Sequence, residues 1–295
     1  MTTIRNTLLQ ATRTISGHVS QAKADLAVAE ERALTGLKAQ RPSDLPEGWY
    51  DAHALRAAIA DQQSWTDNAS RGSSILNTVE STLGSASDLL KVARERAVQG
   101  ASETLATDER VTMAVEIDAL RGQLLTLGNT QINGRYLFAG EAYDQPAFDA
   151  AGAYMGTTDV PTVMVGANRF IDNGFDGGEV FQGSVDAFQV LTDLADAMRA
   201  DDAPGVAALL GDLDTALGQL IEGRQKVGYL TQDNADARAV AESMSVVFEE
   251  RLNDVIGVDP VQAYSDLANL KTAYESTLQV SAGVLNGASL FNFLR

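Results

Sequence analysis

Small and apolar residues recur at alternating four- and three-residue steps from the start of the chain. This spacing is that of a heptad seam, in which one side of a helix faces a partner. The series is Leu8, Thr12, Ile15, Val19, Ala22, Leu26, Ala29 and Ala33. Threonine and alanine bury little apolar area, so we expect a helix that is marginal alone and needs a partner. Gly36 follows and is expected to stop this helix.

A break and a pair of helices follow this first helix. Residues 38–53 are KAQRPSDLPEGWYDAH, and their prolines and glycine predict a hairpin-like loop, with helix resuming near His53. Heptad seams then run over 73–101 and 106–128, and the short connection between them predicts an antiparallel helix pair. Thr107 is the expected N-cap of the second helix of this pair.

The pattern changes in the middle of the chain. Between residues 139 and 183 glycine is frequent, and the run VPTVMVGANRFIDNGF is rich in β-formers with glycine and asparagine turns. We predict a small β-rich insert here, which is too short for an independent core and therefore leans on the helices. Helical seams return after Gly183 and continue to about Val255.

The last helix carries two apolar stripes instead of one. Asp259 is its expected cap, Pro260 its first helical residue, and Gln262 the partner in a capping box. One stripe holds Leu267, Lys271, Tyr274, Leu278, Ser281 and Leu285, and the other holds Leu270, Ala273, Thr277, Val280 and Val284. Two stripes require partners on two sides, so we expect the terminal helices to bury apolar surface against other subunits.

The predicted fold is mainly α with a small β-rich insert, and its N- and C-terminal parts form a long antiparallel helical bundle or coiled coil. Five segments follow from the pattern. They are an N-terminal assembly helix (1–40), the first half of a helical domain (41–138), a small β-rich outer domain (139–183), the second half of the helical domain (184–257) and a C-terminal assembly helix (258–295).

Composition narrows the class of protein. The 295 residues include 22 Lys and Arg against 40 Asp and Glu, and this balance argues against binding to nucleic acid or an anionic membrane. No cysteine is present, which excludes disulfides, thiolate catalysis and zinc–thiolate sites. The N-terminal stretch lacks the apolar core of a Sec signal peptide, and no apolar run is long enough to span a membrane. We therefore expect any export from the cell to use another route.

The sequence offers no constellation that suggests catalysis. His18 and His53 are far apart, and no HExxH motif occurs. The stretch DNGFDGGE at 172–179 lacks the spacing of a calcium loop and is expected to be a turn. We therefore expect no enzyme activity, no cofactor and no metal. The alternative class is an extracellular enzyme or adhesin on a helical stalk, for which segment 139–183 is short and poor in histidine, although a binding surface there stays open.

Several stretches, in register over nearly the whole chain, resemble the flagellin-like axial proteins of the bacterial flagellum. They are LTGLKAQRPSDLP, LLKVARERAVQGASETLATDERVTMAVEIDALRGQLLTLGNTQINGRYLFAG, GGEVF, GRQKVGYLTQDN, VDPVQAYSDL and SLFNFLR. NGRYLFAG and the middle of the chain favour the hook–filament junction branch of that family, while NTQINGRYL is also similar to filament flagellin, the alternative. The sequence departs from the family at PEGWYDAH, which leaves the shape of that loop open.

The resemblance implies a structural subunit of the extracellular flagellum that assembles through its terminal helices. The implied partners are other copies in a ring or helical array, a hook-associated protein on the hook side, flagellin or a flagellin-side adaptor, and the flagellar type III export machinery with a dedicated chaperone. The expected assembly residues are Leu8, Ile15, Val19, Leu26, Leu267, Tyr274, Leu278, Leu285, Leu290 and Phe291. The expected junction between the helical and β-rich domains comprises Gly134, Tyr136, Leu137, Phe138 and Gly140.

Overall fold

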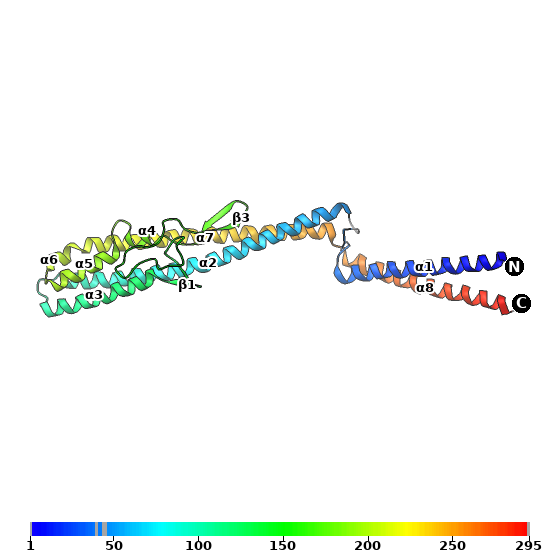
Figure 1. Cartoon of the computed structure of the whole chain (residues 1–295), viewed down its shortest axis with the longest axis horizontal. Coiled ribbons are helices and arrows are strands. Elements are labelled where there is room, and N and C mark those ends of the chain that lie inside the picture. The colour runs from blue at the N-terminus through cyan, green and yellow to red at the C-terminus, as the bar shows by residue number, and fades with distance from the viewer. Residues whose placement is uncertain (1, 39–40, 43–45, 294–295) are drawn as a thin grey trace. The chain divides into compact units, whose positions relative to one another are not determined.

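The computed structural model describes residues 2–38, 41–42 and 46–293, with side chains described at 10, 12–38, 41–42, 46 and 48–283. The fold is mainly α with a small β part, as the sequence predicted (Figure 1). Its elements are α1 (Thr2–Thr35), α2 (Pro46–Gly100), α3 (Thr107–Gly128), β1 (Gln131–Ile132), β2 (Arg135–Tyr136), β3 (Thr162–Gly166), β4 (Arg169–Asp172), α4 (Gly177–Gln182), α5 (Ala187–Arg199), α6 (Ala203–Ala208), α7 (Leu210–Ile256) and α8 (Pro260–Phe293).

The chain divides into two compact units. Residues 1–60 and 245–295 form the terminal unit, and residues 61–244 form the central unit. Both divisions fall within helices, one in α2 and one in α7. The division into five segments that the sequence suggests remains a prediction, and its β-rich segment 139–183 lies within the central unit.

In the terminal unit, α1 and α8 lie side by side, with both ends of the chain at the same end of the pair (Figure 1). Gly36 stops α1 as predicted, because its φ is 70° and its N–H donates to the Arg32 carbonyl at 2.9 Å. Backbone hydrogen bonds from Lys38 N to Ile256 O (2.7 Å) and from Val258 N to Gly36 O (2.9 Å) then join the end of α1 to the chain entering α8.

The start of α8 confirms the predicted cap and corrects the predicted capping box. The Asp259 carboxylate accepts the Val261 N–H at 2.8 Å, as expected of an N-cap that precedes a helix beginning at Pro260. The capping box is wrong, because the Gln262 side-chain amide donates forward to Asp266 at 2.8 Å and does not serve the cap.

α2 begins earlier than the sequence pattern predicted. Pro46 is its first residue, so residues 46–52 are helical, and the prediction that helix resumes near His53 is wrong. Proline at the first helical position loses no hydrogen bond, because the first N–H groups have no partner within the helix. The Arg56 guanidinium lies 5.5 Å from the Trp49 ring centre, and this contact stabilises the first turns of α2.

Arg110 closes the short connection between α2 and α3. Its side chain is buried, and it donates from Nε to the Gly100 carbonyl at 2.9 Å and from Nη2 to the Ser102 carbonyl at 2.8 Å. Carbonyls at the end of a helix lack partners within it, so the arginine satisfies them. The predicted antiparallel pairing of α2 and α3 is confirmed, and an ion pair of 2.7 Å between Arg96 and Glu116 links the two helices.

The N-terminus of α3 lacks the predicted cap. Ala106 occupies the N-cap position and makes no side-chain hydrogen bond there. Thr107 is the first helical residue, and its hydroxyl donates to the Asp201 carboxylate at 2.8 Å. The prediction that Thr107 is the N-cap is therefore wrong by one position. Its hydroxyl bonds to Asp201, which is distant in the sequence, and does not cap the helix. Asp108 and Glu109 lie in the first turn, where acidic side chains complement the positive helix end.

The β part consists of two hairpins in the described residues. β1 and β2 are joined by Asn133 (φ 52°) and Gly134 (φ 78°), the left-handed pair that a type I′ turn requires. Strands of two residues give no alternating pattern, so this hairpin was not predicted from the sequence. The β3–β4 hairpin confirms the predicted β-rich run, and Met164 pairs with Phe170 in its register.

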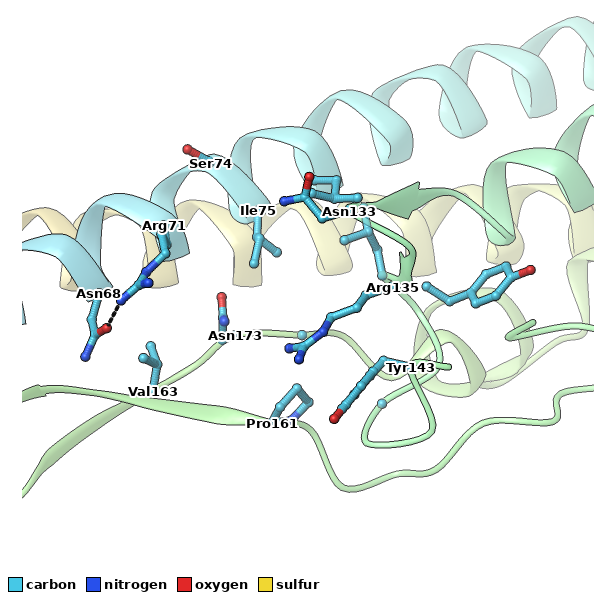
Figure 2. Close-up of a pocket in the computed structure, with 15 residues that line it drawn as sticks. Asn68, Arg71, Ser74, Ile75, Asn133, Arg135, Tyr143, Pro161, Val163 and Asn173 are labelled. Carbon is cyan, nitrogen blue, oxygen red and sulfur yellow. Dashed lines mark hydrogen bonds between the residues drawn. The ribbon is translucent and has the colours of Figure 1, made fainter. Parts of the chain in front are cut away.

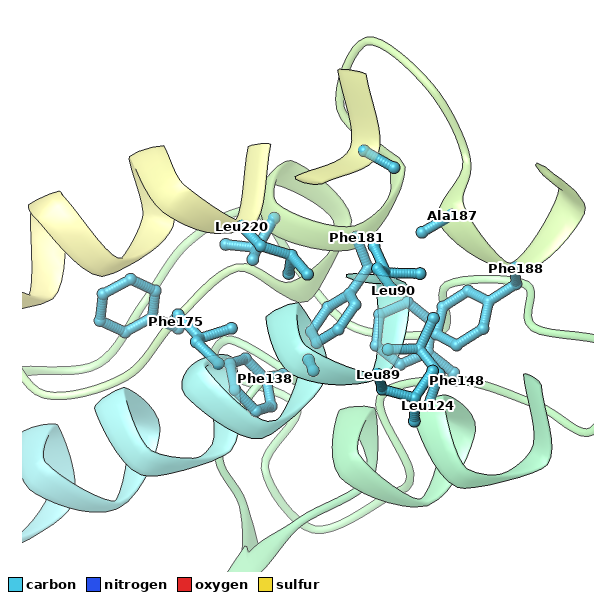
Figure 3. Packing of buried hydrophobic residues seen from close by; sticks show 14 of the residues in the cluster. Leu89, Leu90, Leu124, Phe138, Phe148, Phe175, Phe181, Ala187, Phe188 and Leu220 are labelled. Carbon is cyan, nitrogen blue, oxygen red and sulfur yellow. The ribbon is translucent and has the colours of Figure 1, made fainter. Parts of the chain in front are cut away.

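An aromatic cluster joins the chain between β2 and β3 to the helices of the central unit (Figure 3). Its members are Phe138, Phe148, Phe181 and Phe188, all of them buried. The Phe138 ring meets the Phe181 ring edge-on at 5.4 Å, and the Phe148 and Phe188 ring centres lie 4.9 Å apart. Figure 3 shows Leu90, Leu124 and Leu220, from α2, α3 and α7, packed around the same cluster. Val165 and Ile171 of the β3–β4 hairpin belong to the same buried core, so the β part shares the core of the helices, as its small size required.

Candidate assembly surface and junction

A narrow seam lies between α1 and α8 in the terminal unit. Its least exposed residues are Ile15, Val19, Ala22, Leu26, Ala29 and Ala33 on α1, and Ala263, Leu267, Leu270, Tyr274, Thr277 and Ser281 on α8. Both series repeat in four- and three-residue steps, as in a coiled coil. Most of these side chains are only half-buried, and several are alanine, serine or threonine. The pair therefore buries little apolar area and gains little stability from its own contact.

The structure sorts the predicted assembly residues into three groups. The group that is half-buried in the seam comprises Ile15, Val19, Leu26, Leu267 and Tyr274. Leu278 lies off the seam with 40% of its surface exposed. The group whose side chains lie outside the described residues comprises Leu8, Leu285, Leu290 and Phe291. A role in assembly remains a prediction for all of them, because a heptad seam suits a partner in the same chain and a partner in another chain equally.

Other apolar side chains of α1 and α8 are exposed to solvent. The most exposed are Leu34, at 86%, and Val261, at 79%. The rest are Val28, Tyr264, Leu278 and Val280. Several exposed apolar side chains on one helix pair mark a candidate interface. Of these exposed residues, only Leu278 is among the assembly residues predicted from the sequence. The sequence pattern does not tell which stripe of α8 faces α1.

Two shallow grooves run along the α1–α8 pair. One, of about 540 Å³, is lined by Val28, Leu270 and Asp266 among others. The other, of about 500 Å³, is lined by residues that include His18 and Val280. Grooves beside a helix seam are where side chains of a neighbouring helix insert. His18 lies at this surface without a second histidine, and neither His18 nor His53 belongs to a metal-binding cluster in the described part of the chain.

The predicted junction residues divide into turn-forming glycines and core residues. Gly134 lies at the β1–β2 turn, Tyr136 is half-buried, and Leu137 and Phe138 are buried. Gly140 has a φ of 61°, and a Cβ added there would lie 2.1 Å from the Thr157 carbonyl oxygen, so only glycine fits. These residues directly follow α3 and join its end to the β part. That these residues form the boundary between two domains remains a prediction.

Backbone hydrogen bonds hold this segment against the chain that enters α4. The Phe175 N–H donates to the Leu137 carbonyl at 3.2 Å, and the Gly177 N–H donates to the Phe138 carbonyl at 2.9 Å. Gly177 is a junction residue that the sequence pattern did not reveal, and a Cβ there would lie 2.7 Å from the Phe138 carbonyl oxygen. Close backbone approach of this kind fixes the start of α4 to the junction segment.

Tyr154 contributes a further polar contact to the same place. Its single O–H proton is shared between the Phe138 carbonyl, at 3.1 Å, and the Thr157 carbonyl, at 2.9 Å. Burial, together with the nearby Asp176 carboxylate, raises the pKa of the Tyr154 phenol well above its usual range. The phenol therefore stays protonated and acts as a structural donor.

Among the helices of the described residues, none is both long and apolar enough to span a membrane.

The sequence has known relatives in the bacterial flagellum. Residues 6–142 match the bacterial flagellin N-terminal helical region. Flagellar hook-associated protein 3 of Escherichia coli K12 is 29% identical over 230 residues, which cover 77% of this chain and 69% of that protein. Flagellar hook-associated protein 3 of Salmonella typhimurium LT2 is 29% identical over 165 residues, which cover 55% of this chain and 52% of that protein.

The fold has a counterpart among solved structures. Flagellar hook-associated protein 3 from Legionella pneumophila superimposes with a TM-score of 0.62, covering 69% of this chain and 99% of that chain. The two sequences are 15% identical, so this likeness bears on the fold alone. The matched helical region, the two relatives and the fold agree with one another. The chain is similar to the flagellin-like proteins of the bacterial flagellum, with hook-associated protein 3 among the relatives that it resembles.

Proposed function

We propose that the chain is a structural subunit of the bacterial flagellum that joins the hook to the filament. The observation that carries this proposal is the α1–α8 pair, whose seam is narrow and whose other faces leave Leu34, Val261 and Val280 uncovered. The similarity to hook-associated protein 3 supports the same role. The proposal requires no catalysis and no cofactor.

In the proposed assembly, exposed faces of α1 and α8 contact the same helices of neighbouring copies. Each leucine that becomes fully buried contributes about 1.5–3 kcal/mol by area, before the cost of ordering. Copies related by a helical operator make head-to-tail contacts, which suit a short tube better than a closed dimer. The seam residues Ile15, Val19 and Leu267 then fix the register of α1 against α8 within each copy.

The proposed position implies further partners. A hook-associated protein would lie on one side and flagellin, or a flagellin-side adaptor, on the other. The chain would reach this position through the flagellar type III export machinery, held by a dedicated export chaperone. Its net charge of -18 supports this route, because repulsion between copies keeps an assembly protein dispersed before it is incorporated.

Filament flagellin is the second candidate. It is favoured by the match of residues 6–142 to the flagellin N-terminal helical region. A filament subunit would use the same terminal helices but would repeat along the whole filament. The two candidates therefore differ in copy number and position, and not in the kind of contact.

Deletion of the gene, followed by electron microscopy of the cells, tests the proposal. A junction subunit predicts cells with bare hooks and with flagellin released into the medium. Loss of the filament subunit itself, with no flagellin in cells or medium, would favour the second candidate. Normal filaments and motility in a deletion strain that lacks a paralogue would refute both.

A further inference from the structure

A pocket of about 610 Å³ lies in the central unit, away from the terminal helices. It is enclosed by α2, the β1–β2 hairpin and the chain on either side of the β3–β4 hairpin (Figure 2). Its polar lining includes Arg71, Arg135 and Asn68, and its apolar lining includes Ile75, Pro161 and Val163. A pocket of this volume accommodates a small ligand or a few residues of a peptide.

The charge of this pocket is opposite to that of the chain. Two arginines and no aspartate or glutamate line it, although the chain has 40 acidic and 22 basic residues. The arginines that form ion pairs elsewhere are Arg94, Arg96, Arg110, Arg169, Arg199, Arg224 and Arg238. Arg71 and Arg135 have no carboxylate partner among the residues that the structure describes. Their charges are therefore available to an anion from outside the chain.

Both guanidinium groups are held in place with free N–H groups. The Arg135 guanidinium stacks on the Tyr143 ring at 4.3 Å, a contact that uses its face and leaves the N–H groups of its edge free. The Arg71 guanidinium donates from Nη2 to the Asn68 amide oxygen at 2.5 Å, and its other donors are free. Figure 2 shows Arg135 extending from the hairpin toward Asn173, and Arg71 extending from α2 to Asn68.

We propose that this pocket binds an acidic peptide segment of another protein chain, with one carboxylate on each arginine. Arg71 lies on α2 and Arg135 on β2, and two nearby Asp or Glu side chains would give one carboxylate to each guanidinium. Ile75 and Val163 offer an apolar floor for the methylene groups of such side chains. A nucleic acid would also carry repeated anions, but its continuing phosphates would meet the acidic remainder of the chain.

Titration of the purified, arginine-labelled protein with hexaglutamate tests this proposal by NMR. Saturable shifts of the Arg71 and Arg135 Nε–H resonances are expected in the millimolar range of peptide, and they should weaken as salt is added. The double variant R71Q/R135Q should bind hexaglutamate at least about tenfold more weakly. Arg56→Gln is the matched control, because Arg56 also lies on an aromatic ring but outside the pocket, and its binding should equal that of the parent protein.

Three outcomes would overturn the proposal. The first is a lack of saturable shifts at Arg71 and Arg135, and the second is equal binding of hexaglutamate by R71Q/R135Q. The third is saturation by glucuronate or inorganic phosphate as tight as that by hexaglutamate, because it would identify a site for a single anion. Circular dichroism of each variant establishes that it is folded, and the titration does not depend on the role of the chain in the flagellum.

Discussion

Individual residues around the Thr157 carbonyl determine how the β part packs against the helices. That carbonyl accepts the Tyr154 hydroxyl at 2.9 Å, and it lies where a side chain at position 140 would begin. The Phe138 carbonyl, a few residues before Gly140, accepts both the Tyr154 hydroxyl and the Gly177 N–H. One left-handed glycine and one protonated phenol thus join three chain segments in a small space.

Gly140→Ala is expected to lower the free energy of unfolding by at least about 2 kcal/mol, because it adds both backbone strain and a clash with the Thr157 carbonyl. Chemical denaturation measures this change. Gly122→Ala is the control, since Gly122 lies in α3 with open space around it, and alanine there should leave stability unchanged or raise it by up to about 1 kcal/mol. Equal effects of the two substitutions would contradict the account.

Tyr154 should make stability depend on alkaline pH. Its folded-state pKa is raised above the unfolded value of about 10, so its contribution is complete below pH 10 and is lost as the pH rises further. We expect the free energy of unfolding to fall by up to about 1.4 kcal/mol per pH unit above pH 10 through this group. Tyr154→Phe should be less stable at neutral pH and should show a smaller slope above pH 10. An identical slope in the variant would show that other groups cause the dependence.

At the scale of elements, the α1–α8 pair presents two kinds of apolar position. Leu267 is half-buried in the seam within the chain, whereas Leu278 lies off the seam and is more exposed. The two leucines lie on one helix, so substituting each in turn distinguishes the stability of the α1–α8 pair from its contact with other copies.

Leu267→Asp should separate α8 from α1, because a charge would enter the seam, and the cost should be at least about 2 kcal/mol. Leu278→Asp should leave helicity and melting of the isolated protein unchanged. Cells with Leu278→Asp are expected to make hooks, export flagellin and fail to retain filaments. Circular dichroism and microscopy measure these results. Loss of helicity in Leu278→Asp, or normal filaments with it, would contradict the proposed outer contact.

Much of the helical layout could be predicted from the sequence, and the limits have physical causes. The heptad steps from Ile15 to Ala29 locate the α1 seam because burial follows helical periodicity. The start of α2 was missed because proline both breaks helices and begins them, as Pro46 does here. Asn133 and Gly134 are a strong turn signal, but strands of two residues leave no pattern beside it. The pocket around Arg71 and Arg135 joins distant segments, which periodicity does not reveal.

At the scale of the whole molecule, the two units differ in how much they bury. In the central unit, Leu76, Leu83, Leu90 and Phe181 are completely shielded from solvent. In the terminal unit, the buried hydrophobic residues among those described are Ala29, Ala52, Ile256 and Ala263. Because local opening depends on buried apolar contacts, the terminal unit should open more readily than the central unit in the isolated protein.

Hydrogen exchange should detect the more frequent opening of the terminal unit. Amides of α1 and α8 are expected to exchange faster than those of α3 and of the α2 segment within the central unit, by an order of magnitude or more. Mass spectrometry of the purified protein measures it, and size exclusion under the same conditions establishes whether it is a monomer. Equal protection of both units in a monomer would contradict the view that α1 and α8 need other copies.

The central claim is that the chain occupies the boundary between hook and filament. Immunogold electron microscopy of isolated flagella, with an antibody to the central unit, tests it most directly. The account predicts gold at one position in each flagellum, where the hook meets the filament. Gold distributed along the filament, or its absence from intact flagella, would contradict the account.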